Sequence, residues 1–159
     1  MPSIRFKMVA AVYVLFMQDD RILLLRRYNT GYEDGNYSLP AGHLDGDEPV
    51  SEAAAREAVE ETGIVIQPRG LDVVHVLHRY TPAEGGVADE RIEFFLRVSH
   101  WKGAPRITEP DKCDELLWAR IDLLPPNTIP YVRHVIDQVV EGSHFSEYGW
   151  PDTSSEATR

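Results

Sequence analysis

Three glutamates near the middle of the chain stand at a spacing that could support metal chemistry. Glu57, Glu60 and Glu61 occupy positions i, i+3 and i+4 of one predicted helix. At about 100° per residue these positions share one narrow arc of the helix surface. Arg56 can relieve Glu52 or Glu60 at a separation of four residues, but one arginine cannot neutralise the whole group. A hard divalent cation with oxygen ligands, Mg²⁺ or Mn²⁺, is the natural counter-charge.

A plainer interpretation stays open beside this one. Glu-rich helix faces are often only solvated, so the cluster alone does not establish a metal site. Glu48 and Glu52 could simply favour the positive N-terminal end of the helix. The opposite arc carries small residues that predict a face packed on the core, namely Ala55, Ala58, Val59 and Thr62.

The elements that must position this helix alternate between strand and helix patterns. Pro49 is suited to the helix start, and Gly63 to a left-handed cap at its end. A second amphipathic helix is predicted at 130–140. Strands are predicted at 9–16, 22–26, 37–39, 71–80, 91–98 and 116–121. Strands interleaved with two helices predict an α/β domain, and the hairpin connections predict a mixed sheet.

Length and composition exclude several classes of protein. The 159 residues, 43% apolar and 26% charged, suit one globular domain. A net charge of −10 argues against a nucleic-acid polymer or an anionic membrane as a partner. The single cysteine, Cys113, rules out a disulfide framework. No apolar run approaches the roughly 20 residues that span a bilayer. We therefore expect a soluble, cytoplasmic protein.

The segment from Gly42 to Ile64 resembles the signature of the Nudix hydrolases. That signature reads Gly, five residues, Glu, seven residues, Arg-Glu, an aliphatic residue, any residue, Glu-Glu, any residue, Gly and an aliphatic residue. The matching positions are Gly42, Glu48, Arg56, Glu57, Glu60, Glu61, Gly63 and Ile64. Ala58 departs from the pattern, because a bulkier aliphatic residue is usual there.

The resemblance implies a fold and a domain organisation. It extends over residues 5 to 142 and includes Leu39-Pro40-Ala41-Gly42, which is similar to the Pro-Gly-Gly lead-in of the family. It implies a Nudix-type α/β/α sandwich with a mixed β-sheet, formed by a single domain at 1–142. Residues 143–159 are left as an unassigned C-terminal tail.

The resemblance also implies a mechanism. Family members use Mg²⁺ to hydrolyse a nucleoside diphosphate linked to another group. Carried over, Glu57, Glu60, Glu61 and the Gly42 carbonyl would hold metal, with Mn²⁺ as a substitute. Glu57 or Glu60 would take the proton of the attacking water, and Arg56 would hold the glutamates in place.

Other residues are candidates outside the signature. Arg26 and Arg27 end a strand and could contact phosphates, or could be an ordinary arginine pair. Glu109, in the loop before the last predicted strand, is the candidate for a further metal ligand, with Glu115 and Glu93 as rivals.

The sequence says least about the substrate. Tyr80 lies sixteen residues beyond Ile64, a placement that resembles the diadenosine polyphosphate hydrolases. The leading hypothesis is a MutT-like hydrolase that converts a nucleoside triphosphate, oxidised forms included, to a nucleoside monophosphate and pyrophosphate. Alternatives are ADP-ribose, a nucleotide sugar or a dinucleoside polyphosphate as substrate. A non-catalytic nucleotide-sensing module ranks below these, because every carboxylate of the signature is present. Whether the chain forms a homodimer stays open.

Overall fold

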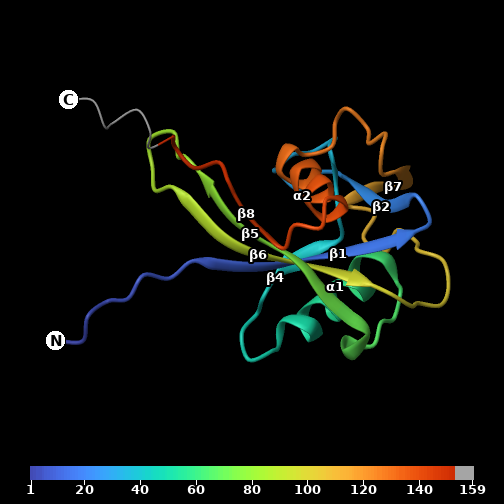
Figure 1. Cartoon of the computed structure of the whole chain (residues 1–159), viewed down its shortest axis with the longest axis horizontal. Helices are drawn as coiled ribbons and strands as arrows, with labels where there is room; N and C mark the ends of the chain where they lie inside the picture. The colour runs from blue at the N-terminus through green and yellow to red at the C-terminus, as the bar shows by residue number, and fades with distance from the viewer. Residues whose placement is uncertain (153–159) are drawn as a thin grey trace.

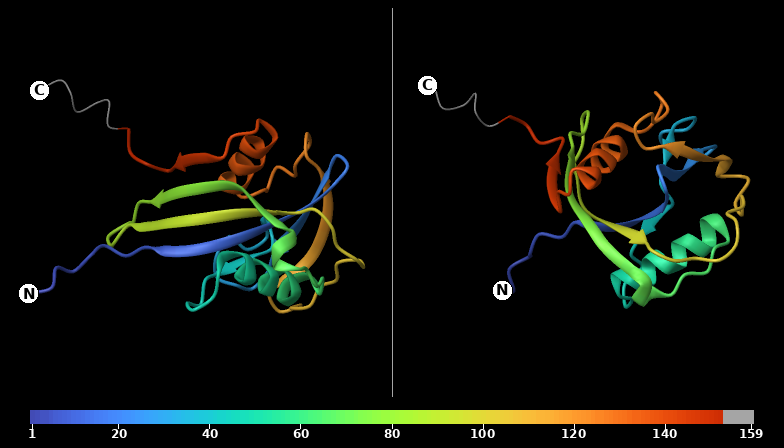
Figure 2. Two further views of the ribbon diagram at one scale, coloured as in Figure 1. Left: turned by 60° about the horizontal axis from the view of Figure 1, so that its bottom comes forward. Right: turned by 45° about the vertical axis from the view of Figure 1, so that its right-hand side comes forward.

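A mixed β-sheet lies between two helices in the computed structural model, which describes residues 1–152 (Figures 1 and 2). The helices are α1 (Val50–Thr62) and α2 (Pro130–Val140), and a short 3₁₀ turn covers Pro68–Gly70. The strands are β1 (Val9–Gln18), β2 (Arg21–Arg27), β3 (Tyr37–Ser38), β4 (Ala41–His43), β5 (Leu71–Thr81), β6 (Asp89–Val98), β7 (Cys113–Arg120) and β8 (Phe145–Tyr148).

The pairing of the strands confirms a mixed sheet. The strand order is β3-β2-β1-β6-β5-β8, with β4 paired to β1 and β7 paired to β2. The β1–β6 and β5–β8 pairs are parallel, and the other pairs are antiparallel. The predicted strands are all present, whereas β4 and β8 had not been predicted as strands.

Strand β1 separates two hydrophobic cores. Residues 11–16 are each at most 5% exposed, as expected for a strand buried on both faces. Val12, Val14 and Phe16 pack in the core that holds the alanines of α1. Ala11, Tyr13 and Leu15 pack in the core that holds the apolar face of α2. Because side chains alternate across a strand, one short segment serves both layers, and the predicted α/β/α sandwich is confirmed.

Helix α1 has the predicted ends but a different buried face. Pro49 is the residue before its first turn, and Gly63 ends it at φ 74°. Ala58 and Thr62 are buried as predicted, but Val59 is 41% exposed. Glu57 is only 8% exposed, because the helix packs over β4 as well as β1 and turns this side chain inward.

The chain beyond residue 142 contributes to the sheet. Strand β8 pairs with β5 along Val76 to Arg79. Trp150 then stacks on Tyr80 with ring centroids 4.8 Å apart. Part of the segment left unassigned at 143–159 is therefore structured, and its residues 153–159 lie outside those described. Within the described part of the chain, no helix has the length and apolar character to cross a membrane.

Candidate active site

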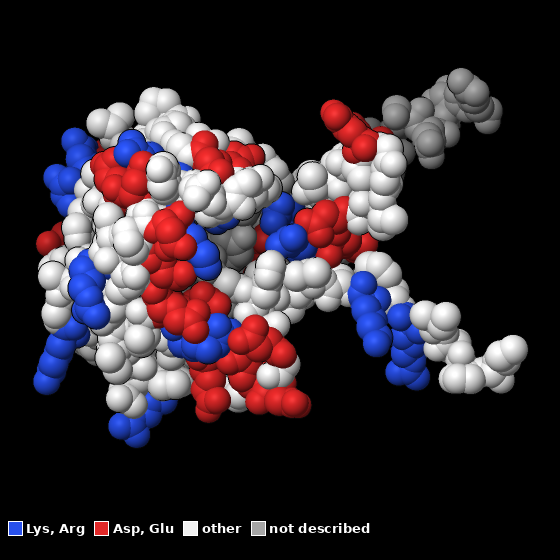
Figure 3. All heavy atoms as spheres, turned by 180° about the vertical axis from the view of Figure 1, so that it is seen from behind, with Lys and Arg blue, Asp and Glu red and all other residues white. Residues whose placement is uncertain are grey.

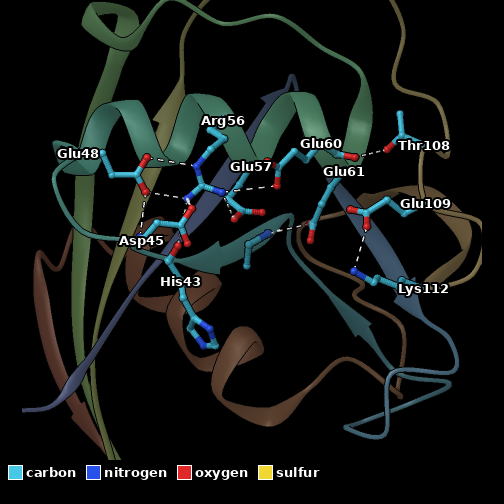
Figure 4. A network of polar contacts seen from close by, with 11 residues as sticks. His43, Asp45, Glu48, Arg56, Glu57, Glu60, Glu61, Thr108, Glu109 and Lys112 are labelled. Atoms are coloured by element: carbon cyan, nitrogen blue, oxygen red, sulfur yellow. Dashed lines mark hydrogen bonds and ion pairs between the residues drawn. The ribbon is translucent and has the colours of Figure 1, made fainter.

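Arg56 joins the acidic residues of α1 to the loop that precedes the helix (Figure 4). Its Nη2 donates to Glu48 Oε1 at 2.7 Å, and its Nη1 donates to Glu57 Oε1 at 2.7 Å. Glu60 Oε2 lies 3.5 Å from the same Nη1. The hydrogen bonds to Glu48, and next those to Glu57, raise the pKa of Arg56. A rigid guanidinium fork can hold several carboxylates in fixed directions, which supports the positioning role inferred for Arg56.

Glu57 lies against the backbone of Gly42. Its carboxylate occupies the space that a Cβ atom at position 42 would fill. Burial raises the pKa of Glu57 to about 7; the hydrogen bond from Arg56 opposes this rise and the charge of Glu60 adds to it. Glycine is thus required here for close approach of a side chain.

Glu61 is held one turn further along the same side of α1. Its Oε2 accepts a hydrogen bond from the Ala41 N–H at 2.9 Å. Enclosure by the protein raises the pKa of Glu61 to about 8, and the charges of Glu57 and Glu109 add to the rise. The neighbouring charges of Glu57 and Glu109 thus disfavour the ionised form of Glu61, and a bound cation would favour it.

Glu109 lies beside this group, whereas its two rivals do not. It forms an ion pair with Lys112 (Oε2 to Nζ, 3.2 Å) and shares a cavity wall with Glu61. Glu115 instead pairs with Arg26, and Glu93 is fully buried in a separate ion pair. Of the three candidates, Glu109 is the one that reaches the carboxylates of α1.

The donors fit a hard divalent cation in kind. Carboxylate oxygens and the Gly42 carbonyl form an oxygen-only set of the type that Mg²⁺ and Mn²⁺ prefer. Within residues 1–152, no three His, Cys, Asp or Glu side chains stand close enough together to hold an ion. Arg56 contacts both Glu57 and Glu60 in this arrangement, so cation binding requires side-chain rotation. Glu60 is exposed and has room for it.

A cavity of about 520 Å³ opens beside these carboxylates. Gly42, Glu61 and Glu109 contribute to its wall. Cationic and aromatic side chains form much of the remainder, namely Arg27, Arg79, Arg91, Lys112, Tyr13, Tyr32 and Tyr131. Figure 3 shows that Asp and Glu atoms gather in a band on one face of the molecule. The volume lies within the roughly 300–1,000 Å³ of small-molecule sites.

The two candidate arginines of β2 lie on opposite faces of the strand, because neighbouring side chains of a strand point in opposite directions. Arg27 lines the cavity. Arg26 instead donates to Asp114 (Nε to Oδ1, 2.7 Å) and pairs with Glu115. Arg27 is thus brought to the predicted site and Arg26 is not.

Tyr80 lies away from the cavity for the same reason. Its ring stacks on Trp150, while the preceding residue of β5, Arg79, lines the cavity. The substrate contact expected from the position of Tyr80 thus has no support in this arrangement.

A buried polar network in the cavity wall was not predicted from the sequence. Arg79 donates from Nε and Nη2 to the two carboxylate oxygens of Glu93 at 3.0 and 2.8 Å. Tyr13 OH donates to Glu93 Oε1 at 3.0 Å and lies 3.0 Å from Tyr131 OH. The signal present in the sequence was an arginine and a glutamate within the two segments predicted as strands at 71–80 and 91–98.

Comparison with known proteins identifies the family. A family model described as the NUDIX domain matches residues 6–139. The chain therefore belongs to the Nudix hydrolase family.

Curated relatives are similar over short segments. An ADP-ribose pyrophosphatase of Methanocaldococcus jannaschii is 38% identical over 61 residues, which cover 38% of this chain and 36% of that protein. Phosphatase NudJ of Escherichia coli K12 is 54% identical over 39 residues, covering 24% of this chain and 26% of NudJ. The aligned segments thus span about a third and a quarter of these relatives.

Solved structures are similar over most of the chain. A MutT NUDIX hydrolase from Burkholderia pseudomallei has a TM-score of 0.74 and 29% identity, with 84% of this chain and 99% of that chain covered. A bifunctional NMN adenylyltransferase/ADP ribose pyrophosphatase from Francisella tularensis, complexed with AMP and a Mn ion, has a TM-score of 0.62 and 20% identity. The match covers 85% of this chain and 42% of that one, and at this identity it supports the fold alone.

Proposed function

We propose that this protein is a divalent-metal-dependent pyrophosphohydrolase that converts a nucleoside triphosphate to a nucleoside monophosphate and pyrophosphate. The observation that carries the proposal is the carboxylate cluster of α1. Arg56 holds Glu57 in this cluster, and Glu61, one turn further on, lines a cavity with cationic and aromatic walls. The similarity to the MutT NUDIX hydrolase of B. pseudomallei, almost all of which is covered, supports this choice of reaction.

The metal is assigned to the residues whose donors fit it. Glu57, Glu60, Glu61 and the Gly42 carbonyl would hold Mg²⁺ or Mn²⁺, with Glu109 as a further ligand. When bound, such a cation lowers the pKa of a coordinated water and offsets negative charge on the phosphates.

The remaining steps fall to the side chains of the chain itself. One water is consumed: its oxygen joins phosphorus, the bridging P–O bond breaks, and its proton passes to Glu57 or Glu60. Both candidates are within reach of Arg56, whose Nη1 lies 2.7 Å from Glu57 Oε1 and 3.5 Å from Glu60 Oε2. Arg56 fixes the direction of these carboxylates. Arg27, whose positive charge is opposite to that of the phosphates, contacts them from the cavity wall.

A second candidate keeps this chemistry and changes the substrate. The M. jannaschii relative is an ADP-ribose pyrophosphatase, so ADP-ribose or another nucleoside diphosphate derivative is the alternative. Dinucleoside polyphosphates follow, and a non-catalytic nucleotide-sensing role ranks last because all the carboxylates are retained.

The test is a product analysis. The purified protein is incubated with nucleoside triphosphates, oxidised nucleotides, ADP-ribose and diadenosine polyphosphates, with Mg²⁺ or with EDTA. We expect metal-dependent release of a nucleoside monophosphate and pyrophosphate from a triphosphate. Glu60→Gln should remove most turnover, whereas Glu52→Gln, an exposed change on the same helix, should not. Preference for ADP-ribose would establish the second candidate, and near-full activity of Glu60→Gln would overturn the site.

A further inference from the structure

The loop at 28–36 presents an exposed aromatic side chain to the cavity. Tyr32 is 46% exposed and lines the cavity together with Arg27 and Thr30. Tyr28, in the same loop, has a similar exposure of 49% but does not line it. A large aromatic ring left in solvent at the wall of a cavity can still bury apolar surface when a ligand arrives.

This loop is tightly built. The Asp34 carboxylate accepts hydrogen bonds from Thr30 Oγ1 at 2.6 Å and from the Gly31 N–H at 2.8 Å. At the far end the Gly35 N–H donates to Arg27 O at 2.8 Å, and Asn127 Nδ2 donates to Gly35 O at 2.8 Å. Because the loop is already ordered, docking a ligand on Tyr32 requires little further loss of conformational freedom.

Arg27 is coupled to Tyr32 directly. Its Nε donates to Tyr32 O at 2.7 Å, and its Cζ lies 5.3 Å from the centroid of the Tyr32 ring. Arg79, Arg91 and Lys112 of the cavity wall each have a carboxylate partner. Arg27 has none within 4 Å among the described residues, and the carboxylates of Asp34 and Glu61 act on its charge only from further away. An anionic ligand can therefore still pair with its guanidinium.

We propose that Tyr32 is the residue on which the planar base of the substrate stacks, while Arg27 of the same unit contacts its phosphates. The inference rests on the proposed nucleotide hydrolysis and adds the residue that selects for a base. Aromatic side chains stack on every base and discriminate little between them, so Tyr32 selects nucleotides as a class.

The test compares Tyr32→Ala, Tyr32→Phe and the matched control Tyr28→Ala. Binding of nucleoside monophosphates is measured by calorimetry in EDTA, and kcat and KM are measured with the preferred substrate and Mg²⁺. We expect Tyr32→Ala to raise both Kd and KM about 10-fold with kcat little changed. Tyr32→Phe, which keeps the ring, and Tyr28→Ala should stay within about 2-fold of the parent.

The outcomes separate the two proposals. Equal effects of Tyr32→Ala and Tyr28→Ala, in a parent protein that hydrolyses nucleotides, overturn the stacking role and leave the proposed function standing. A loss of binding in Tyr32→Phe as large as in Tyr32→Ala also overturns stacking, because the hydroxyl would then be the group that matters. A parent protein that neither binds nor hydrolyses any nucleotide overturns the proposed function itself.

Discussion

The carboxylate of Glu57 fills the space beside Gly42 that any other residue would need for its own side chain. Gly42→Ala should therefore displace Glu57 from its position between β4 and α1. Because small misplacements of catalytic groups cost up to about 10²-fold, we expect kcat to fall by about that factor. Steady-state kinetics with saturating Mg²⁺ measures this.

Gly70→Ala is the matched control, because a Cβ at position 70 meets no atom within 4 Å and the residue has no positive φ. Comparable activity in the two variants would show that the contact between Gly42 and Glu57 is of no catalytic importance.

Replacement of Arg56 by lysine should impair turnover while the charge is conserved. Lysine cannot span Glu48 and Glu57 as the guanidinium does at 2.7 Å to each. Loss of a group that orients metal ligands typically costs about 10–100-fold in affinity or activity. Activity and the Mg²⁺ concentration for half-maximal rate are measured, with the exposed Arg69→Lys as control. A parent-like metal requirement in Arg56→Lys would contradict the positioning role.

Breaking the ion pair between Arg79 and Glu93 should lower the free energy of unfolding far more than breaking an exposed ion pair. Arg79 is 6% exposed and Glu93 is fully buried, so Glu93→Gln leaves an unbalanced charge in the interior. Breaking such a pair costs about 3–5 kcal/mol of unfolding free energy. Asp122→Asn, which removes an exposed pair with Arg120, should cost less than about 1 kcal/mol. Urea denaturation compares the two, and similar losses would refute the difference.

Acid should weaken the attachment of β8 through His134. Its Nε2 lies 2.9 Å from Ser146 Oγ, and the Ser146 hydroxyl also contacts His75 Nε2 at 2.7 Å. Burial, and then the charge of His75, lower the pKa of His134, while Asp137 and Glu141 oppose this. The unfolded chain therefore binds more protons, so this contribution to stability is present above about pH 6.5 and is lost as the pH falls through the lower folded value.

Urea denaturation at about pH 7.5 and about pH 5.5 measures the effect. The parent protein should lose more stability between these values than His134→Gln does. Equal losses would assign the acid sensitivity to other groups.

Periodicity predicted the elements well because it reports local geometry. The bounds of α1 follow from Pro49 and Gly63, and burial on both faces of β1 follows from its continuous apolar run. The same periodicity could not say how α1 is rotated on the sheet. The burial of Glu57 and the exposure of Val59 depend on β4, whose three residues had no strand pattern of their own.

Residues outside the signature were harder to place because their positions depend on long-range pairing. Arg26 and Arg27 are identical in type, and only the register of β2 decides which one faces the cavity. On β5, Arg79 likewise faces the cavity, whereas Tyr80 faces away from it and stacks on Trp150. Strand β8 forms by pairing with the edge of β5. This long-range pairing cannot be seen in the short segment of sequence that forms β8.

Because side chains alternate along β1, the candidate metal ligands and the cavity wall rest on different cores. The buried alanines of α1 belong to one core, and Tyr13 and Tyr131 of the cavity wall belong to the other. Substitutions in the core beside α2 can therefore change the shape of the cavity while the core beneath α1 stays intact. The structure thus separates the packing that supports the candidate metal ligands from the packing that shapes the pocket beside them.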